Sequence, residues 1–387
     1  MQIHMKILHI ISGGDTGGAK THVINLLKEL QKNISVDLIC FMDSAFTEEA
    51  RSQKINLEVF NQRSRLDFFA VKKVIDKIKR ENYDVIHCHG ARANFISLMI
   101  KTHCKNPIVT TIHSDYRLDF QGGLFKRLVY TSVNAVSLRF IDYYIGVSPS
   151  FQAMMVSRGF PLDRVFSVYN GIADDDVMCM PRVDFLKKYH IPYTGEEIFV
   201  GIMGRLHPVK GHDVFLEAAQ TAYKADSRLR FLIAGDGNEE QKIKGLVKKL
   251  NLSDVTHLIG FVSNPYDFFN AIDINTLTSH SESFPYVILE GALCKKATIS
   301  SNVGGIGDLI TDGVTGYVFS MDGREVLSSK MVELALSKEK RVKLGEALYQ
   351  KVKDRFSTSN MAAQHIKIYE EIMRRHASSG GIKDEND

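Results

Sequence analysis

Short apolar runs of strand type alternate with amphipathic helical patterns along nearly the whole chain. In residues 21–32, for example, apolar side chains repeat with the period of a helix and lie on one face: Val23, Ile24, Leu27 and Leu30. Strands that alternate with helices form parallel sheets that helices cover on both faces. The pattern therefore predicts an α/β fold built on doubly wound, Rossmann-like sheets.

Strand-type runs occur in both halves of the chain. The clearest are Lys6–Ile11, Tyr83–His89, Ile108–His113, Phe199–Gly204, Leu229–Ala234 and Ile274–Thr278. A length of 387 residues suits two domains, each large enough to bury its own core. We therefore expect two Rossmann-like domains in tandem that face a central crevice at the carboxyl ends of both sheets.

Composition predicts where the domains begin and end. Residues 1–181 form the first domain, the polar segment 182–197 forms a linker, and residues 198–359 form the second domain. A periodic segment at 360–377 is predicted to be a C-terminal helix. Residues 378–387 are rich in glycine, serine and charge, so we expect a disordered tail there.

The composition is that of an ordinary globular protein, 44% hydrophobic and 24% charged. Residues 1–182 contain 23 Lys and Arg against 18 Asp and Glu, whereas the remainder contains 26 against 27. This excess is too small for a nucleic-acid-binding protein, so we expect no nucleic-acid partner. It suits contact with an anionic membrane surface, although ordinary scatter explains it equally well.

Five cysteines are scattered along the chain without a Cys-x-x-Cys pair. This arrangement argues against a disulfide framework or a zinc site and favours a reducing compartment. The apolar run at residues 7–11 is too short for a signal-peptide core, and no run approaches the ~18 residues of a membrane span. We expect a cytoplasmic protein, either free or peripheral on the inner face of the membrane.

Two carboxylates, Glu282 and Glu290, flank a run that is typical of a loop followed directly by a buried helix. Pro285 stands where the first turn begins, which proline tolerates because its missing N–H has no partner there. The amides of Phe284 and Tyr286 would then point toward an anion such as a phosphate. The flanking carboxylates would bind hydroxyl groups, as the order of parts in a nucleotide sugar requires, although this spacing also arises by chance.

A glycine-rich segment, Gly13–His22, follows the first predicted strand and opens the first helix. Gly17 and Gly18 would let the backbone approach a ligand closely. The spacing is neither the dinucleotide fingerprint Gly-x-Gly-x-x-Gly nor a P-loop, which disfavours a nicotinamide dehydrogenase. The alternative is a glycine turn that binds nothing.

A second loop, Gly204–Gly211, follows the first strand of the second domain. It contains Arg205 and Lys210, two cations that can neutralise a diphosphate leaving group. No Asp-x-Asp metal site follows a strand at this edge, so we expect neither a metal ion nor a cofactor. The alternative is a surface loop with two solvated cations.

Three weaker signals complete the set. The loop Val303–Asp308 carries glycines after a predicted strand, as a ligand-binding loop would. His113 ends another strand, where it can bind a sugar hydroxyl or a phosphate, or simply a backbone group; His87 is interpreted as a core residue. Residues 117–139 interleave basic and apolar side chains, which is typical of a membrane-surface helix and equally of an ordinary solvated helix.

In combination and in this order, these residues resemble the retaining glycosyltransferases of family four, which have the two-domain GT-B fold. The resemblance covers nearly the whole chain. Its most specific parts are Gly204-Arg205-Leu206 with Lys210-Gly211, the pair Glu282 and Glu290, and Val303-Gly304-Gly305.

The resemblance implies a position for each part of a nucleotide-sugar donor in the second domain. Arg205 and Lys210, with Gly204 beside them, would hold the diphosphate. Glu290 would accept both ribose hydroxyls. Glu282 would contact hydroxyls of the transferred sugar.

It also implies contacts from the neighbouring turn and from the other domain. Phe284 and the turn Pro285–Tyr286 would lie against the phosphate and the sugar. Gly17 and Gly18 would approach the donor from the first domain, and His113 would bind near the reacting sugar. The C-terminal helix would cross back and pack on the first domain.

The chain departs from the family pattern at three places. Family members often read Asn-Gly-Val-Asp where this chain has Asn170-Gly171-Ile172-Ala173, so that no role of that aspartate carries over. Gly307 stands where proline is frequent, which loosens its loop. Pro285 stands where glycine is common, which removes one amide donor.

The resemblance implies transfer of a hexose from a nucleoside diphosphate sugar to a hydroxyl of a glycan or lipid-linked acceptor, in cell-surface polysaccharide or glycolipid synthesis. UDP is the commonest donor nucleotide in the family, and no residue excludes GDP. The resemblance also implies retention of anomeric configuration. Because no nucleophile-and-base pair is evident on the far face of the sugar, we expect a front-face displacement. Two other functions stay open, a nucleotide-sugar epimerase of the same fold and a non-catalytic nucleotide-sugar-binding protein.

Overall fold

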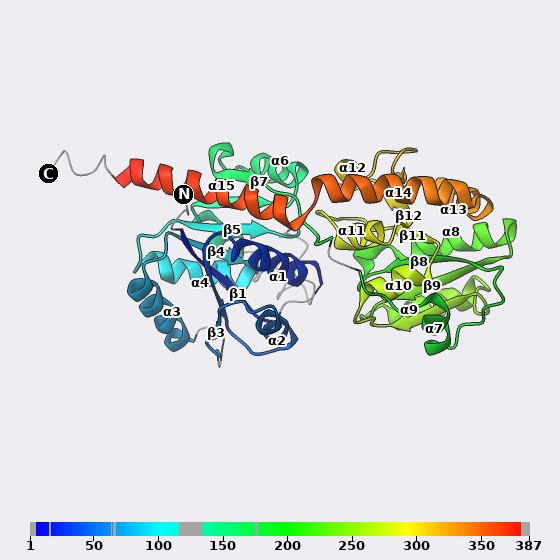
Figure 1. The fold of residues 1–387 in the computed structure, drawn as a ribbon, viewed down its shortest axis with the longest axis horizontal. Coiled ribbons are helices and arrows are strands. Elements are labelled where there is room, and N and C mark those ends of the chain that lie inside the picture. Colours follow the sequence, from blue (N-terminus) through cyan, green and yellow to red (C-terminus); the bar gives the residue numbers. More distant parts are fainter. Residues whose placement is uncertain are drawn as a thin grey trace. The chain divides into compact units, whose positions relative to one another are not determined.

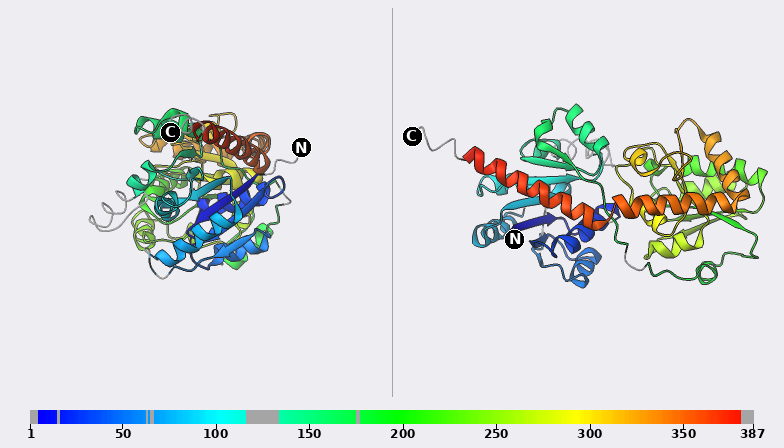
Figure 2. Two further views of the ribbon diagram at one scale, coloured as in Figure 1. Left: turned by 90° about the vertical axis from the view of Figure 1, so that its left-hand side faces the viewer. Right: turned by 45° about the horizontal axis from the view of Figure 1, so that its top comes forward.

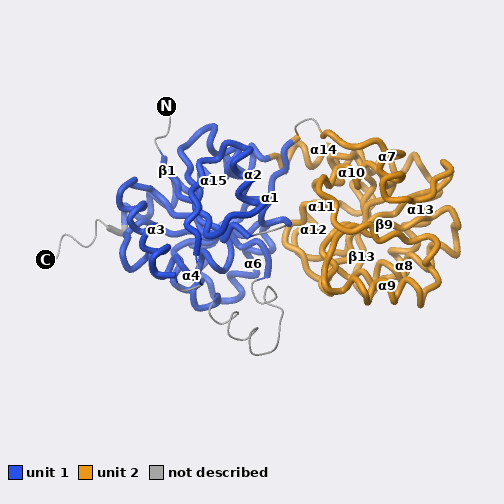
Figure 3. Tube along the Cα trace, turned by 90° about the horizontal axis from the view of Figure 1, so that it is seen from below, with its two compact units in different colours: residues 1–173, 358–387 blue, residues 174–357 orange. Residues whose placement is uncertain are grey.

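The computed structural model describes residues 5–14, 17–62, 64, 67–115, 134–174 and 177–380, and every structural statement refers to these. The chain divides into two compact units (Figure 3). The first unit comprises residues 1–173 and 358–387, and the second comprises residues 174–357. Each contains a parallel sheet with helices on both faces (Figure 1), which confirms the predicted fold class.

In the first unit, the described strands form a seven-stranded parallel sheet in the order β3-β2-β1-β4-β5-β6-β7. The strands are β1 Lys6–Ile11, β2 Ser35–Cys40, β3 Leu57–Val59, β4 Val85–His89, β5 Ile108–Ile112, β6 Tyr143–Gly146 and β7 Val165–Ser167. The helices are α1 Gly18–Leu30, α2 Ala45–Ser52, α3 Phe68–Glu81, α4 Gly90–Lys101, α6 Pro149–Ser157, the short η1 Leu162–Arg164 and α15 Thr358–Gly380.

Alternate residues of β1 enter opposite cores. Ile7 and Ile11 pack with side chains of α1, α2 and α15, whereas Leu8 and Ile10 pack with those of α3, α4 and α6. Because helices cover both faces, the strand is apolar at nearly every position rather than at every second one. Each such buried aliphatic side chain stabilises the fold by about 1.5–3 kcal/mol relative to its exposure.

In the second unit, the described strands form a six-stranded parallel sheet in the order β10-β9-β8-β11-β12-β13. The strands are β8 Ile198–Met203, β9 Leu229–Ala234, β10 Thr256–Gly260, β11 Ile274–Leu277, β12 Ala297–Ser301 and β13 Tyr317–Phe319. The helices are α7 Arg182–Lys188, the short η2 Pro208–Lys210, α8 His212–Ala225, α9 Glu240–Lys249, α10 Pro265–Ala271, α11 Tyr286–Leu293, α12 Ile306–Leu309, α13 Arg324–Leu336 and α14 Lys338–Arg355.

The boundary between the units differs from the predicted one. The chain enters the second unit between Ala173 and Asp174, and residues 182–197 are not a linker. They include α7, which buries Phe185 and Leu186 in the core that also contains α10. The segment contains one proline, Pro192, and many polar residues, so its composition conceals the apolar face that this short helix contributes.

The C-terminal helix α15 is part of the first unit. Met361, Tyr369 and Ile372 enter the core that α1 also lines, and α15 lies against α1 (Figure 2). The helix continues to Gly380, so residues 378–380 of the predicted disordered tail are helical. Residues 381–387 lie outside the described part of the chain.

Candidate active site

The second sheet has a topological switch point between β8 and β11. From β8 the chain adds β9 and β10 on one side of the sheet, and it then returns to add β11, β12 and β13 on the other. The loops that leave the carboxyl ends of two such strands diverge and leave room for a ligand. The loops 204–211 and 278–285 leave these two strand ends, and both contain predicted site residues.

Hydrogen bonds join the two loops. The Thr278 hydroxyl donates to the carbonyl oxygens of Lys210 and Gly211 at 3.0 and 2.8 Å, and the His280 amide donates to the Val209 carbonyl oxygen at 2.8 Å. Gly211 has a φ of +62°, and a Cβ there would lie 2.1 Å from the Thr278 carbonyl oxygen. Glycine at 211 therefore permits the close approach of the loops.

Lys210 and Glu282 form an ion pair at this junction. Lys210 Nζ lies 2.5 Å from Glu282 Oε1, and the Ser279 hydroxyl donates to the same oxygen at 2.6 Å. The side chains are only 21% and 10% exposed, so water and salt screen the pair less than a surface pair. A positioned cation next to a positioned carboxylate suits a substrate that presents phosphate oxygens beside hydroxyl groups.

Arg205 follows Gly204 directly after β8, and its side chain is exposed. It forms no hydrogen bond or ion pair with any described residue. The Gly204 amide donates to the Ala234 carbonyl oxygen at 3.0 Å, which anchors the backbone beside it. The planar guanidinium is therefore available to an anion such as a phosphate.

Helix α11 starts immediately after Pro285, which occupies the N-cap position, and no side chain caps its first turn. Phe284 is 1% exposed and packs on Phe356 with ring centroids 5.1 Å apart. The Tyr286 side chain is also buried. This corrects the expectation that Phe284 itself lies against the donor, because its ring belongs to the core and only the backbone of this turn is left to contact a ligand.

Glu290 lies one turn into α11, on a partly exposed face that it shares with Val287. Its carboxyl group has no hydrogen-bond or ion-pair partner within the described ranges. Burial raises the pKa of Glu290 to about 7. An unpaired, partly buried carboxylate destabilises the ligand-free protein, and such groups are concentrated at functional sites.

The raised pKa of Glu290 predicts that the ligand-free protein becomes less stable as the pH rises from about 4.5 to about 7. The folded carboxyl binds its proton with a pKa of about 7, whereas the unfolded one has the ordinary value of 4.5, so in this range the folded state holds more protons. Glu290→Gln removes this dependence and should raise the free energy of unfolding near pH 8 by on the order of 1–3 kcal/mol. Urea unfolding near pH 5 and pH 8 tests this, and equal pH dependences of wild type and variant would contradict it.

The loop Val303–Gly305 supports the loop that carries Glu282. The Gly305 amide donates to the Ser283 carbonyl oxygen at 2.8 Å. Gly304 has a φ of +56°, and a Cβ there would lie 1.8 Å from the Glu282 carbonyl oxygen. The glycine run therefore serves the close packing of two backbones at the site.

Gly304→Ala should destabilise the protein by about 2–4 kcal/mol, because the new Cβ clashes with backbone in a left-handed conformation. Gly307→Ala is the matched control, since a Cβ at 307 would meet nothing within 4 Å. Gly307 lies in α12, so alanine there should be neutral or slightly stabilising. Thermal unfolding compares the two variants, and equal midpoints would refute this explanation of Gly304.

Two family models match the chain. The model described as "Glycosyl transferases group 1" matches residues 187–351, and the model described as "Glycosyltransferase Family 4" matches residues 16–176. Together they extend over both units. This chain is a family-four glycosyltransferase.

Relatives and solved structures agree with this assignment. The O-antigen biosynthesis glycosyltransferase WclY of Escherichia coli is 25% identical over 96% of this chain and 99% of its own. The N-acetyl-alpha-D-glucosaminyl L-malate synthase of Bacillus anthracis is 26% identical over 80% of each chain. The crystal structure of Anabaena Alr3699/HepE with UDP and glucose matches the GT-B fold with a TM-score of 0.80, at 22% identity, over 95% of this chain and 100% of that one.

In the first unit of this glycosyltransferase, the predicted residues follow β1 and β5. Gly17 is the N-cap of α1 with a φ of +63°, Gly18 is the first residue of the helix, and both are exposed. His113 follows β5 and is partly exposed, and its ring centroid lies 4.7 Å from that of His22 on α1. Burial lowers the pKa of His113 to about 4. His87 is fully buried, as interpreted from the sequence.

Other residues shape the candidate site without having been predicted. Ser279 positions Glu282, as described above. Gly235 and Gly237, after β9, have φ values of +132° and +153° and pack against the loop after β8; a Cβ at 235 would lie 1.9 Å from the Gly204 carbonyl oxygen. The signal for these two is the sequence Gly-Asp-Gly at the end of a predicted strand.

Most of the predicted basic segment 117–139 lies outside the described residues, which resume at 134. Arg139 contacts its own unit, because its guanidinium lies over the Phe160 ring at 5.0 Å and donates to the Arg158 carbonyl oxygen. Among the described helices of the glycosyltransferase, none has the length and the apolar content needed to cross a membrane.

Proposed function

We propose that this chain transfers a hexose from a UDP-sugar to a hydroxyl of a glycan or lipid-linked acceptor, with retention of anomeric configuration. The observation that carries the proposal is the convergence of three features at the β8–β11 switch point. These are the unpaired cation Arg205, the Lys210–Glu282 pair and the unpaired carboxyl of Glu290.

The proposed donor places its parts in the same order as these groups. Arg205 and Lys210 bind the diphosphate, Glu290 accepts the ribose hydroxyls, and Glu282 binds hydroxyls of the hexose. Glu282 and Lys210 already hold each other in the ligand-free protein, so little side-chain ordering is left to be done when the donor binds. For Gly17, Gly18 and His113 of the first unit, a role in donor binding stays a prediction from the sequence.

In the proposed reaction, the bond between the sugar anomeric carbon and the diphosphate oxygen breaks, and a bond from that carbon to the acceptor oxygen forms on the same face. The departing phosphate oxygen takes the acceptor proton. Arg205 and Lys210 stabilise the charge that develops on the diphosphate, in the manner of preorganised electrostatic catalysis. We infer that added Mg²⁺ is unnecessary, because the two cations supply this charge.

The names of related proteins support the substrates. Anabaena HepE has been crystallised in complex with UDP, with UDP and glucose, and with UDP-glucose, and WclY is an O-antigen biosynthesis glycosyltransferase. On this basis we propose that the acceptor belongs to a cell-surface polysaccharide or glycolipid. A lipid-linked acceptor would place the reaction at the cytoplasmic face of the membrane.

The proposal is tested in two steps. Thermal unfolding with a panel of nucleotides and nucleotide sugars should show the largest rise with UDP compounds, since ligand at about 100 times its Kd adds roughly 2.7 kcal/mol. Mass spectrometry should then detect the hexose on an acceptor together with free UDP, at a rate that added Mg²⁺ leaves unchanged, and NMR should show retention. Conversion of the nucleotide sugar without an acceptor would indicate an epimerase, and binding without turnover would indicate a binding protein.

A further inference from the structure

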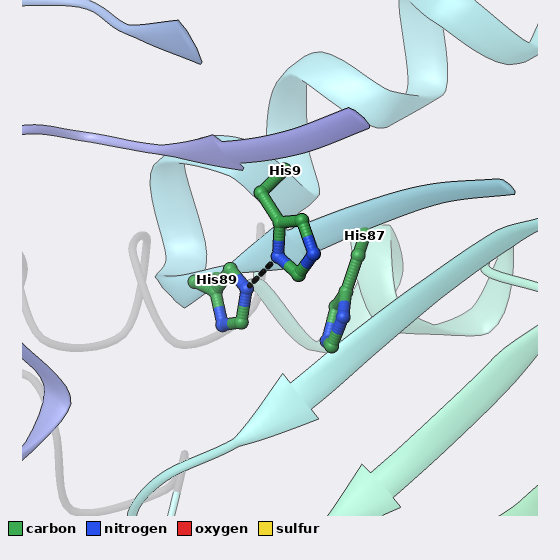
Figure 4. A group of neighbouring side chains, drawn as sticks. All are labelled: His9, His87 and His89. Carbon is green, nitrogen blue, oxygen red and sulfur yellow. Dashed lines mark hydrogen bonds between the residues drawn. The ribbon is translucent and has the colours of Figure 1, made fainter. Parts of the chain in front are cut away.

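A cluster of histidines lies at the switch point of the first sheet, where β1 and β4 are neighbours. His9 on β1 is in register with His87 on β4, and His89 ends β4 (Figure 4). His22 on α1 and His113 after β5 extend the cluster through ring contacts. The carboxyl edge of a sheet at its switch point is a preferred place for ligands, and the proposed sugar transfer gives most of these imidazoles no role.

Burial lowers the pKa of the histidines in this cluster. Burial, with a smaller contribution from neighbouring imidazoles, holds the pKa of His22 and of His89 well below the ordinary value. Burial lowers the pKa of His113 to about 4. A neutral imidazole presents one nitrogen lone pair, which is the form that binds metal ions.

His22, His89 and His113 have the spacing of ligands that share one metal ion. Their ligand nitrogens all lie within 4.8 Å of one another. His89 Nδ1 and His113 Nε2 are 3.4 Å apart, which is long for a hydrogen bond. Two nitrogens on a tetrahedral zinc ion, with Zn–N about 2.0–2.1 Å, lie about 3.3–3.4 Å apart.

The ring positions agree with the same arrangement. Imidazoles bound to one tetrahedral ion have their ring centroids about 5 Å apart, given the same Zn–N distance. The centroids of His22, His89 and His113 are separated by 4.7, 5.6 and 6.0 Å. Small movements of the side chains would bring all three nitrogens into ligand distance.

The hydrogen bond of His22 turns its lone pair toward the site. His22 Nδ1 lies 2.8 Å from the Asn170 side-chain oxygen, which can only accept, so Nδ1 carries the proton and Nε2 carries the lone pair. His22 Nε2 is buried and has no hydrogen-bond partner among the described residues. A histidine that ligates a metal through one nitrogen commonly donates its other N–H to an oxygen in this way.

A hydrogen bond with His9 positions the ring of His89. His9 Nδ1 and His89 Nε2 are hydrogen-bonded at 3.0 Å (Figure 4), which leaves Nδ1 of His89 for the site. The other group of three, His9, His87 and His89, is a poorer metal site. Both nitrogens of His87 are hydrogen-bonded at 2.7 Å, to the Tyr369 and Thr111 hydroxyls, and its ring stacks on His89 at 4.2 Å.

We propose that His22, His89 and His113 bind one divalent transition-metal ion in the first unit, with Zn²⁺ as the best match to three neutral imidazoles. Three protein ligands leave the fourth tetrahedral position to water or to a substrate oxygen. His113 is partly exposed and provides the route by which the ion enters. The site lies wholly in the first unit and does not depend on how the donor binds to the second. It departs from the sequence-based expectation of no metal ion, which rested on the scattered cysteines and on the absence of an Asp-x-Asp site at the diphosphate loops.

Cobalt titration of tag-free protein tests the proposal. After treatment with EDTA and dialysis, the wild type should bind one Co²⁺ per chain with the strong visible absorption of a tetrahedral site, and Zn²⁺ should abolish that absorption. Competition with a coloured chelator then measures the Zn²⁺ affinity. Absence of a stoichiometric visible spectrum would overturn the proposal.

Variants assign the ligands. His22→Gln and His113→Asn should each weaken Zn²⁺ binding by about 100-fold or more, whereas the exposed His103→Gln should have no effect. Circular dichroism and thermal unfolding of the metal-free variants show whether they are folded. If His22→Gln does not fold, His113→Asn at the exposed edge decides the question. Wild-type affinity in either folded variant would overturn the assignment. Unchanged UDP binding of His22→Gln, a residue outside the proposed donor site, would keep the metal site separate from that site.

Discussion

Arg205→Ala should lower kcat by on the order of a hundredfold or more, the largest effect expected of any single change in the second unit. The guanidinium stands exposed after β8 with no partner in the described structure, so its charge is available to the departing diphosphate. Removing one preorganised group that stabilises charge in a transition state costs about 2.7–4 kcal/mol. Folding should be unaffected, because the exposed side chain makes no hydrogen bond or ion pair with a described residue.

Steady-state kinetics of UDP release measures this effect, with two companion variants. Arg205→Lys keeps a charge but loses the planar fork, so its rate should lie between those of wild type and alanine variant. Arg230→Ala is the control, because Arg230 lies at the opposite, amino end of β9 and bonds the backbone at Ser227 and Leu229. A rate for Arg205→Ala within a few fold of wild type would remove this arginine from the mechanism.

Glu290→Gln should raise the donor KM by about 10- to 100-fold while the unfolding midpoint stays equal or rises. Hydrogen bonds to a charged group contribute about 1.5–3 kcal/mol, and the amide of glutamine keeps the shape but not the charge. Because Glu290 has no partner in the described protein, no structural bond is lost. Weaker binding together with unchanged or higher stability separates a ligand-binding carboxylate from a structural one.

Glu346→Gln is the matched control for Glu290. Glu346 lies in α14 of the same unit and forms an exposed ion pair with Lys295, which contributes little to stability. Isothermal titration with UDP and with the donor sugar measures both variants. Equal affinity of Glu290→Gln and wild type for UDP would show that the ribose does not bind at this carboxylate.

Several elements of the fold were predictable at the level of single residues. The predicted strand Leu229–Ala234 has the observed bounds, and a helix follows Pro285 as predicted. Both are short apolar runs that polar or turn-forming residues enclose, so local pattern alone sets their ends. The start of α1 at Gly18 was missed, because glycine is a weak helix former and its place in the helix depends on the loop before it.

The domain boundary was the clearest error. Segment 182–197 was predicted to be a linker from its proline, its glycine and its polar residues, yet Phe185 and Leu186 are buried in a core of the second unit. A short helix shows too few turns for its apolar period to stand out from its composition. The Phe284 ring was misplaced for a related reason, since its partner Phe356 is remote in the sequence.

The sequence by itself determined the fold class, the order of the elements and the identity of the charged residues after β8 and β11, because hydrophobic period and turn chemistry are local properties. Only the tertiary structure decided that Lys210 pairs with Glu282, 72 residues away, and that the ring nitrogens of His22, His89 and His113 lie within 4.8 Å of one another. These contacts depend on the order and register of parallel strands. Crossover helices separate such strands in the sequence, so no local pattern specifies which strand ends become neighbours.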